Sequence, residues 1–214
     1  MYYDRRAPLH DDYLGYASGP KNEQLVAPLI RIFEDRVSHK KVLEVACGTG
    51  IWTRILASRA RSVLATDINP SVLDIARVKC CEADTVTFRT ADAYRLKGIR
   101  GPYETAFAAD WWSHIPKSRL PVFLNALHRK LKPGSSVVFV DMLPNRDLHR
   151  MFSHYDEEGN LIQRRLLPDG QQFHVVKNFP TRQELFESLA GQAQDIEYHE
   201  HHALNRWVLI YRTV

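Results

Sequence analysis

The sequence contains no apolar stretch long enough to cross a bilayer, and its first residues lack the apolar core of a signal peptide. Its three cysteines include an adjacent pair, Cys80 and Cys81, and their spacing fits neither a disulfide framework nor a zinc site. Repeats and low-complexity tracts are also absent. These absences argue against membrane-spanning, disulfide-rich and repeat proteins, and we expect a cytoplasmic protein without a membrane partner.

A clustered basic stripe is missing as well, although the formal net charge is +4 and the isoelectric point is near 9.0. Such a stripe is the electrostatic footprint of a nucleic-acid partner, but here the basic residues alternate with acids from Arg5 to Arg212. We therefore expect no nucleic acid partner. The length of 214 residues predicts a single domain, residues 1–214, present as a monomer or a homodimer.

Short apolar runs alternate with helical periodicity along most of the chain. Strands are expected at 41–45, 62–67, 85–90, 104–110 and 136–141, with helices at 22–37, 52–57, 70–78 and 117–131 around them. A further helix should open at the capping-box pattern Thr181 to Glu184, followed by strands at 195–200 and 206–213. This alternation predicts an α/β fold, a doubly wound and mostly parallel sheet.

Two segments do not follow this alternation. Residues 1–20 are rich in tyrosine and charge, and we interpret them as an arm in which Tyr3 or Tyr13 could cover a ligand. Residues 143–180 are polar and poorly periodic, but the turn signal Pro168-Asp-Gly170 lies between two runs, 161–167 and 171–176. This pattern predicts a β-hairpin insertion on the substrate side of the sheet.

A glycine turn follows the first expected strand, in the order Glu44-Val-Ala-Cys-Gly48-Thr-Gly50. A dinucleotide fingerprint would need a third glycine where Thr53 stands, which weakens that alternative. Glu-x-x-x-Gly-x-Gly resembles the first motif of the class I S-adenosylmethionine-dependent methyltransferases, with Ala46 at a position that is often glycine in that family. The resemblance implies a seven-stranded sheet whose last strand is antiparallel. A plain tight turn remains the alternative explanation of the motif taken alone.

Acidic side chains lie at or beside the end of each of the first five expected strands, namely Glu44, Asp67, Asp92, Asp110 and Asp141, and ligands of open α/β sheets bind at that edge. Asp67 could accept hydrogen bonds from both hydroxyls of a ribose, although it could equally cap the helix that follows. The resemblance implies that Ile68 lies against adenine and that Asp92 and Ala93 meet its amino group and a ring nitrogen. The expected cofactor is S-adenosyl-L-methionine, and the expected cofactor-binding residues are Tyr3, Tyr13, Glu44, Ala46, Gly48, Gly50, Asp67, Ile68, Asp92, Ala93 and Asp110.

The loop after the fourth strand supplies the candidate for catalysis. His114 is a natural general base, because histidine can exchange a proton near neutral pH, and the alternative is a structural histidine bonded to the backbone. Trp111 could form a wall of the acceptor pocket. Asp110 and Asp141 resemble the carboxylates of magnesium-dependent catechol methyltransferases, but Met142 replaces a ligating asparagine, so we expect no metal.

The insertion carries a narrower resemblance. The run Arg164-Arg-Leu-Leu-Pro-Asp-Gly170 with 175–180, together with Trp111 to Pro116, is similar to phosphonate O-methyltransferases. Arg164, Arg165 and Lys177 are accordingly expected at the acceptor, together with Trp111 and His114, because guanidinium groups match phosphonate and carboxylate oxygens. The expected acceptor is a small molecule, methylated on oxygen. A solvated hairpin face, an RNA methyltransferase and a non-catalytic nucleotide-binding module remain alternatives.

Overall fold

The computed structural model describes residues 20–80, 83–144, 153–167 and 169–214. The expected lid residues, Tyr3 and Tyr13, lie outside the described residues.

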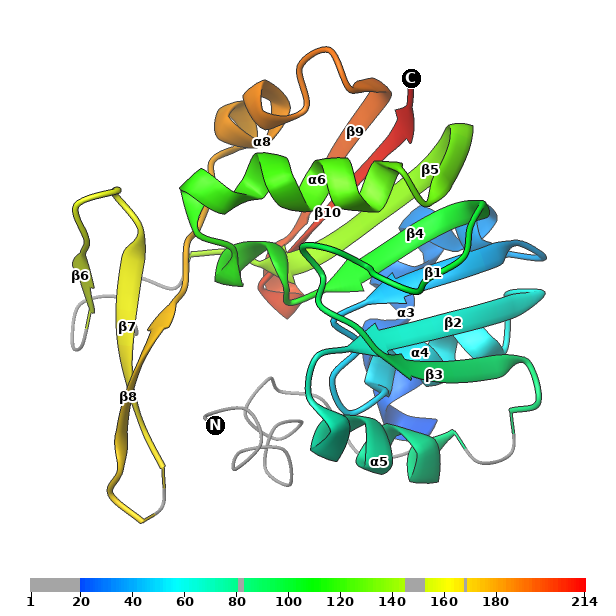
Figure 1. The fold of residues 1–214 in the computed structure, drawn as a ribbon, viewed down its shortest axis with the longest axis horizontal. Coiled ribbons are helices and arrows are strands. Elements are labelled where there is room, and N and C mark those ends of the chain that lie inside the picture. The colour runs from blue at the N-terminus through cyan, green and yellow to red at the C-terminus, as the bar shows by residue number, and fades with distance from the viewer. Residues whose placement is uncertain (1–19, 81–82, 145–152, 168) are drawn as a thin grey trace.

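A seven-stranded sheet forms the centre of the molecule (Figure 1). Its strands lie in the order β3-β2-β1-β4-β5-β10-β9, and the parallel pairs β1–β2, β1–β4, β2–β3 and β4–β5 make up one side of it. β10 runs antiparallel to both β5 and β9, as the resemblance implied. The strands are β1 (Lys41–Val45), β2 (Ser62–Asp67), β3 (Val86–Thr90), β4 (Tyr103–Ala109), β5 (Leu131–Met142), β9 (Ala193–His201) and β10 (Arg206–Thr213).

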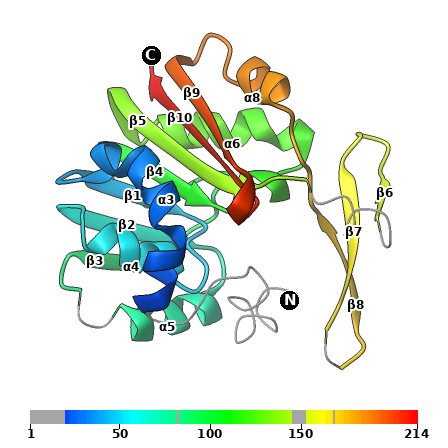
Figure 2. The same cartoon turned by 180° about the vertical axis from the view of Figure 1, so that it is seen from behind.

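Helices cover both faces of this sheet, and each face has its own apolar core. α3 (Pro20–Val37) and α4 (Ile51–Ala57) pack on one face around Phe33, Trp52 and Phe107, and α5 (Pro70–Lys79) contacts α4, β2 and the edge strand β3 (Figure 2). α6 (Leu120–His128) and α8 (Arg182–Ser188) cover the other face, around Phe139. This three-layer α/β arrangement is the one that the alternation of strands and helices predicted.

A second, three-stranded sheet stands beside the main one, in the order β6-β7-β8 (Figures 1 and 2). Its strands are β6 (Ser153–Tyr155), β7 (Leu161–Leu166) and β8 (Gln172–Val176). β7 and β8 pair antiparallel, which confirms the hairpin predicted around residues 168–170, whereas β6 was not expected.

The boundary between α6 and β5 differs from the expectation. The sequence predicted one helix from 117 to 131, but the chain forms a short 3₁₀ turn at Lys117–Arg119, then α6 to His128, and Leu131 already pairs with Tyr103 in the sheet. The next paired residues are Thr105 and Ser136, so the segment around Pro133 leaves the ladder. Proline has no N–H to donate, which explains the interruption.

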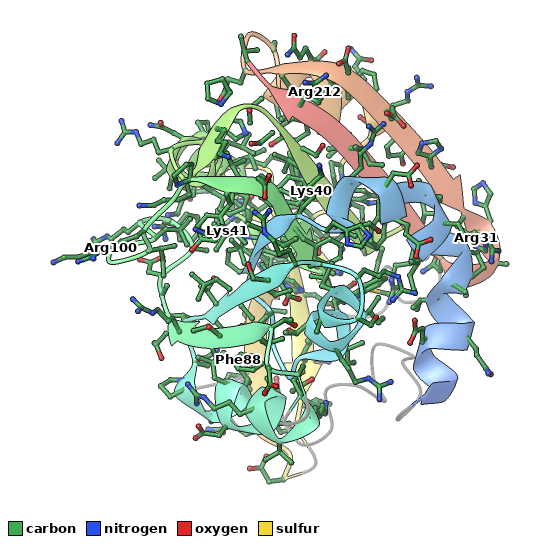
Figure 3. All side chains as sticks on the ribbon, turned by 90° about the vertical axis from the view of Figure 1, so that its right-hand side faces the viewer. Arg31, Lys40, Lys41, Phe88, Arg100 and Arg212 are labelled. Atoms are coloured by element: carbon green, nitrogen blue, oxygen red, sulfur yellow. The ribbon has the colours of Figure 1, made fainter. Side chains whose placement is uncertain are left out.

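None of the helices in the described ranges is long and apolar enough to cross a membrane. On the side of the molecule drawn in Figure 3, Arg31 on α3, Arg100 on the loop before β4 and Arg212 on β10 lie far apart. This spread agrees with the scattered basic residues of the sequence.

The turn between β1 and α4 depends on Gly50, and this gives a stability test. Gly50 has φ +83°, and a Cβ added there would lie 2.8 Å from Cβ of Ala76 on α5. Gly98 has a similar φ of +77°, but an added Cβ would meet nothing. Both alanine variants bear the left-handed backbone penalty of about 1–2 kcal/mol, and we expect Gly50→Ala to lose about 1–3 kcal/mol more through overpacking. Urea unfolding of both variants measures the difference, and equal losses would contradict the close approach.

Candidate functional site

A cavity of about 280 Å³ opens at the carboxyl ends of β1 to β4. The loops after these four strands line most of it, and Arg119 and Arg165 join them from other segments. β1 and β4 are neighbours in the sheet, but the chain leaves β1 toward β2 and leaves β4 toward β5, in opposite directions, so a crevice remains between the two connections. The cavity therefore lies at the switch point of the sheet, where the sequence predicted a ligand.

Asp67, at the end of β2, connects two of the lining loops. Its carboxylate accepts hydrogen bonds from Gly48 N at 3.0 Å and from Asn69 N at 2.9 Å, and its residue is 8% exposed. Each carboxylate oxygen can accept more than one hydrogen bond, so these two leave capacity for a ligand hydroxyl. Asp67 therefore both shapes the glycine turn and presents an acceptor group to the cavity.

An apolar side chain and a second acid follow on the neighbouring loops. Ile68 lines the cavity and is 59% exposed, although apolar side chains of that size are usually covered. Asp92 and Ala93 line the same cavity after β3, where Asp92 Oδ1 accepts a hydrogen bond from Tyr94 N at 2.9 Å. A flat ring with polar edges would cover Ile68 and meet Asp92.

Among the described residues, two of those predicted to bind the cofactor do not line the cavity. Glu44 is 2% exposed beneath the turn, and Gly50 lies at the start of α4 against Ala76. Burial raises the pKa of Glu44 from about 4.5 to about 8, an effect that the hydroxyl of Thr53 reduces and the charge of Asp67 increases. Glu44 is accordingly protonated at neutral pH in this structure, whereas Ala46 and Gly48 of the same turn reach the cavity.

Strained backbone occurs at two lining positions. Ala46 and Asp110, which directly follow β1 and β4, have φ angles of 54° and 51°, a region that residues other than glycine rarely adopt. Asp110 lies 3.8 Å from the guanidinium of Arg206, and both side chains are almost completely buried. Such strain is often found at functional sites, and here it directs both loops into the cavity.

An aromatic wall limits the cavity on its far side. Trp111, Tyr94 and Phe123 pack edge to face, with ring centroids 5.9–6.5 Å apart. The guanidinium of Arg119 lies 3.6 Å from the centre of the Tyr94 ring, a cation–π contact. This contact fixes one positive charge at the rim of the cavity.

His114 lies on the cavity wall, on a 3₁₀ turn (Trp112–His114) after β4. Its Nδ1 is 2.7 Å from the carbonyl oxygen of Val176. A carbonyl can only accept, so Nδ1 carries the hydrogen, and the lone pair of the neutral ring is on Nε2. The small sheet therefore selects the tautomer of His114, because Val176 ends β8.

The three cations predicted for the acceptor are not brought together. Arg165 lines the cavity, where its Nε donates to Gln163 Oε1 at 3.1 Å. Arg164 is exposed and, because it directly precedes Arg165 in β7, points to the opposite side of the strand. Lys177 is 3% exposed and bonded to Ser113, away from the cavity.

Several lining residues were not among the predicted site residues, chiefly Asn69, Tyr94 and Arg119. Asn69 and Tyr94 each lie two positions after a predicted acid, Asp67 and Asp92, so the loop position was a usable signal. Arg119 had no such signal, because its distance to the cavity depends on the short turn that replaces the start of the expected helix. Among the described residues, no group of three or more histidine, cysteine or acidic side chains could hold a metal.

The whole fold matches solved methyltransferases. The complex of DhpI with SAM and HEP superposes with a TM-score of 0.77 at 30% identity, covering 99% of this chain and 94% of that one. DhpI with SAH gives a TM-score of 0.76 at 27% identity. A family model described as a methyltransferase domain matches residues 42–134. The chain belongs to the class I S-adenosylmethionine-dependent methyltransferases.

Curated relatives of this methyltransferase match over a shorter length. A ubiquinone biosynthesis O-methyltransferase of Azotobacter vinelandii is 30% identical over 106 residues, which are 49% of this chain and 45% of the relative. A protein-L-isoaspartate O-methyltransferase 2 of Syntrophobacter fumaroxidans is 29% identical over 157 residues, 72% of this chain and 60% of the relative. The chain thus spans less than half the length of the ubiquinone enzyme.

The cavity of this methyltransferase suits S-adenosylmethionine, the cofactor of the family. The glycine turn leaves room at Gly48, Asp67 offers carboxylate oxygens suited to ribose hydroxyls, and the exposed Ile68 offers an apolar surface suited to adenine. These groups lie along one crevice of the sheet, as an elongated ligand requires.

The buried Glu44 makes the stability of the methyltransferase depend on pH. Its pKa is about 8 when folded and about 4.5 when unfolded, so the folded chain holds an extra proton between these values. Stability should therefore fall as pH rises from about 5 to about 8, by at most about 1.4 kcal/mol per pH unit.

Glu44→Gln should remove this dependence, because the amide keeps the shape and does not ionise. Relative to the wild type, this variant should gain stability as pH rises, in urea unfolding at several pH values without cofactor. Glu187→Gln removes an exposed carboxyl as the control. An unchanged pH dependence in Glu44→Gln would show that Glu44 is ionised when folded.

Proposed function

We propose that this protein transfers the methyl group of S-adenosylmethionine to an oxygen of a small anionic acceptor, a phosphonate or a carboxylate. In the proposed complex, Asp67 holds the ribose, Ile68 and Asp92 hold the adenine, and the acceptor lies between His114 and Arg165. The observation that carries the proposal is that His114 and Arg165 line the same cavity as the cofactor residues.

The cofactor supplies a methyl group on a sulfonium, so the carbon–sulfur bond breaks as the new carbon–oxygen bond forms. In such a displacement an enzyme gains most by holding the nucleophile in line and by taking its proton where there is one. An acceptor oxygen that is already ionised needs orientation, whereas a hydroxyl must lose a proton. The two cases assign different roles to His114.

The geometry of His114 supports both roles. With Nδ1 donating to Val176 O, the Nε2 atom of the neutral ring can take a proton from a hydroxyl. The imidazolium form can instead donate from Nε2 to an ionised oxygen. In each case the bond to Val176 fixes the direction of the ring.

The charges around His114 support an anionic acceptor. Arg165 reaches the cavity from the small sheet, and Arg119 is fixed over Tyr94 at its rim. The acid nearest in sequence, Asp110, lies beside the buried Arg206. Two guanidinium groups therefore face the cavity, and such groups bind carboxylate and phosphonate oxygens in a bidentate way.

The comparisons support transfer to oxygen. The ubiquinone biosynthesis relative is an O-methyltransferase, and DhpI has been solved with SAM and HEP together. The similarity to DhpI extends over the whole chain, including the small sheet that carries Arg165.

The cofactor assignment can be tested at Asp67. Asp67→Ala removes a hydrogen-bonding carboxylate and should weaken S-adenosylhomocysteine binding by about 1.5–3 kcal/mol, measured by calorimetry. Asp74→Ala removes an exposed carboxylate of α5 and should leave affinity unchanged. Binding of NAD without binding of S-adenosylhomocysteine would overturn the assignment.

The acceptor can be tested by labelled methyl transfer to matched anionic and neutral oxygen acceptors. We expect anionic acceptors to be preferred, and Arg165→Ala to lose about 10–100-fold in kcat/KM for them, because a charge-assisted bond worth about 1.5–3 kcal/mol is lost. Arg164→Ala is the matched control on the opposite side of the strand and should retain full activity.

His114→Ala separates the two roles of the histidine. It should reduce transfer to hydroxyl acceptors by about 10²–10⁴-fold and transfer to ionised oxygens less. A preference for neutral acceptors, with the activity of Arg165→Ala unchanged, would contradict the proposal of an anionic acceptor. Full activity of His114→Ala on a hydroxyl acceptor would exclude His114 as the general base.

Salt-sensitive methylation of RNA would favour the alternative of an RNA methyltransferase.

A further inference from the structure

A buried ion pair contacts Ser113, the residue that precedes His114. Asp141, near the end of β5, has no exposed side-chain surface, and Nζ of Lys177 lies 3.4 Å from its Oδ1. The side chain of Lys177 is 4% exposed. A charge buried to this degree is tolerated when it is paired and hydrogen-bonded.

Ser113 lies between these two charges. Its hydroxyl donates to Asp141 Oδ1 at 2.9 Å and accepts from Lys177 Nζ at 2.7 Å, while its backbone N–H donates to Asp141 Oδ2 at 2.9 Å. Met142 N donates to the same carboxylate. The carboxylate therefore holds the turn that carries His114 on one side and the small sheet on the other.

The residues next to this network hold His114 itself. Val176, whose carbonyl accepts the hydrogen of His114 Nδ1, directly precedes Lys177. Asn178 follows Lys177 and donates from its backbone N–H to the carbonyl of Ser113 at 2.7 Å. The segment 176–178 is thus connected to the turn 113–114 at three successive residues.

We propose that Lys177 and Asp141 are positioning residues, which act through Ser113 and Val176 to fix the tautomer and direction of His114. This inference rests on the proposed role of His114 in the reaction, and it gives Lys177 a task other than acceptor binding. Without the ion pair, segment 176–178 loses its charged anchor and keeps only its backbone hydrogen bonds, so the carbonyl of Val176 is held less firmly against His114.

Lys177→Met is the principal test, with Lys117→Met as the matched control. Lys117 is also 3.4 Å from a carboxylate, Glu184, but that pair is about half exposed. Long-range ¹⁵N–¹H correlation spectra report the His114 tautomer without any acceptor. We expect Nδ1–H in the wild type and in Lys117→Met, and a mixture of tautomers in Lys177→Met.

Kinetics give the second measurement. Lys177→Met should lower kcat for methyl transfer by about 10–100-fold, the size of effect known for the partners that orient metal-bound histidines, with the Kd of S-adenosylhomocysteine unchanged. In a His114→Gln background the same substitution should have little further effect, because it acts through the histidine. An equal loss in both backgrounds, or an unchanged tautomer in Lys177→Met, would overturn the proposal.

Unpaired Asp141 could unfold the single variant, so Lys177→Met with Asp141→Asn removes both charges, and Ser113→Ala removes the bridging hydroxyl alone. Each variant should show a mixture of His114 tautomers, and retention of Nδ1–H in both would refute the proposal.

If the wild type methylates no acceptor, the proposed function fails, while the spectra still decide whether Lys177 and Asp141 position His114.

Discussion

The position of β1 between β2 and β4 is the constraint on which the rest of the structure depends. Parallel strands end at the same edge of a sheet, and here the chain leaves β1 toward β2 while β4 pairs on the other side. The loops after these strands are therefore separated at their bases, which leaves a crevice. The hydrogen bonds of Asp67 to Gly48 and Asn69 then hold two of the loops at its edge.

Buried charge in this protein is handled in three ways, each with a consequence for the site. Glu44 holds a proton under the glycine turn, because burial raises its pKa to about 8. Asp110 lies beside Arg206, and Asp141 pairs with Lys177 through Ser113. The sequence showed all three carboxyl groups as acids at strand ends. It could not show the burial of Glu44 or the cations beside Asp110 and Asp141, because these depend on contacts between segments far apart in the chain.

The strands of the main sheet, the order of its elements, and the glycine turn and acids that line the cavity could be predicted from the sequence, because their signals are local. A buried parallel strand needs a continuous apolar run, and the glycine turn needs small residues at fixed spacing. The limits of the expected helix at 117–131 could not be predicted in the same way. Leu131 fits the apolar pattern of that helix, but its pairing with Tyr103 places it in β5.

The basic residues expected at the acceptor were predicted less well for a related reason. Residues 164, 165 and 177 are all basic in the sequence, and nothing local shows which of them turns toward the cavity. Alternation along β7 separates Arg164 from Arg165, and the Asp141 carboxylate draws Lys177 into the interior. Arg119 lies at the rim because a 3₁₀ turn precedes α6.

The two sheets contribute different residues to the cavity. The main sheet alone forms the glycine turn and places Asp67 and the exposed Ile68 at the cavity, whereas β7 and β8 bring Arg165 and the carbonyl that selects the His114 tautomer. A substitution in the small sheet can therefore change the position of Arg165 and the direction of His114 together, while Gly48, Asp67 and Ile68 stay in place. Because Val176 and Lys177 are adjacent, the group that directs His114 and the group that anchors the small sheet to β5 move as one unit.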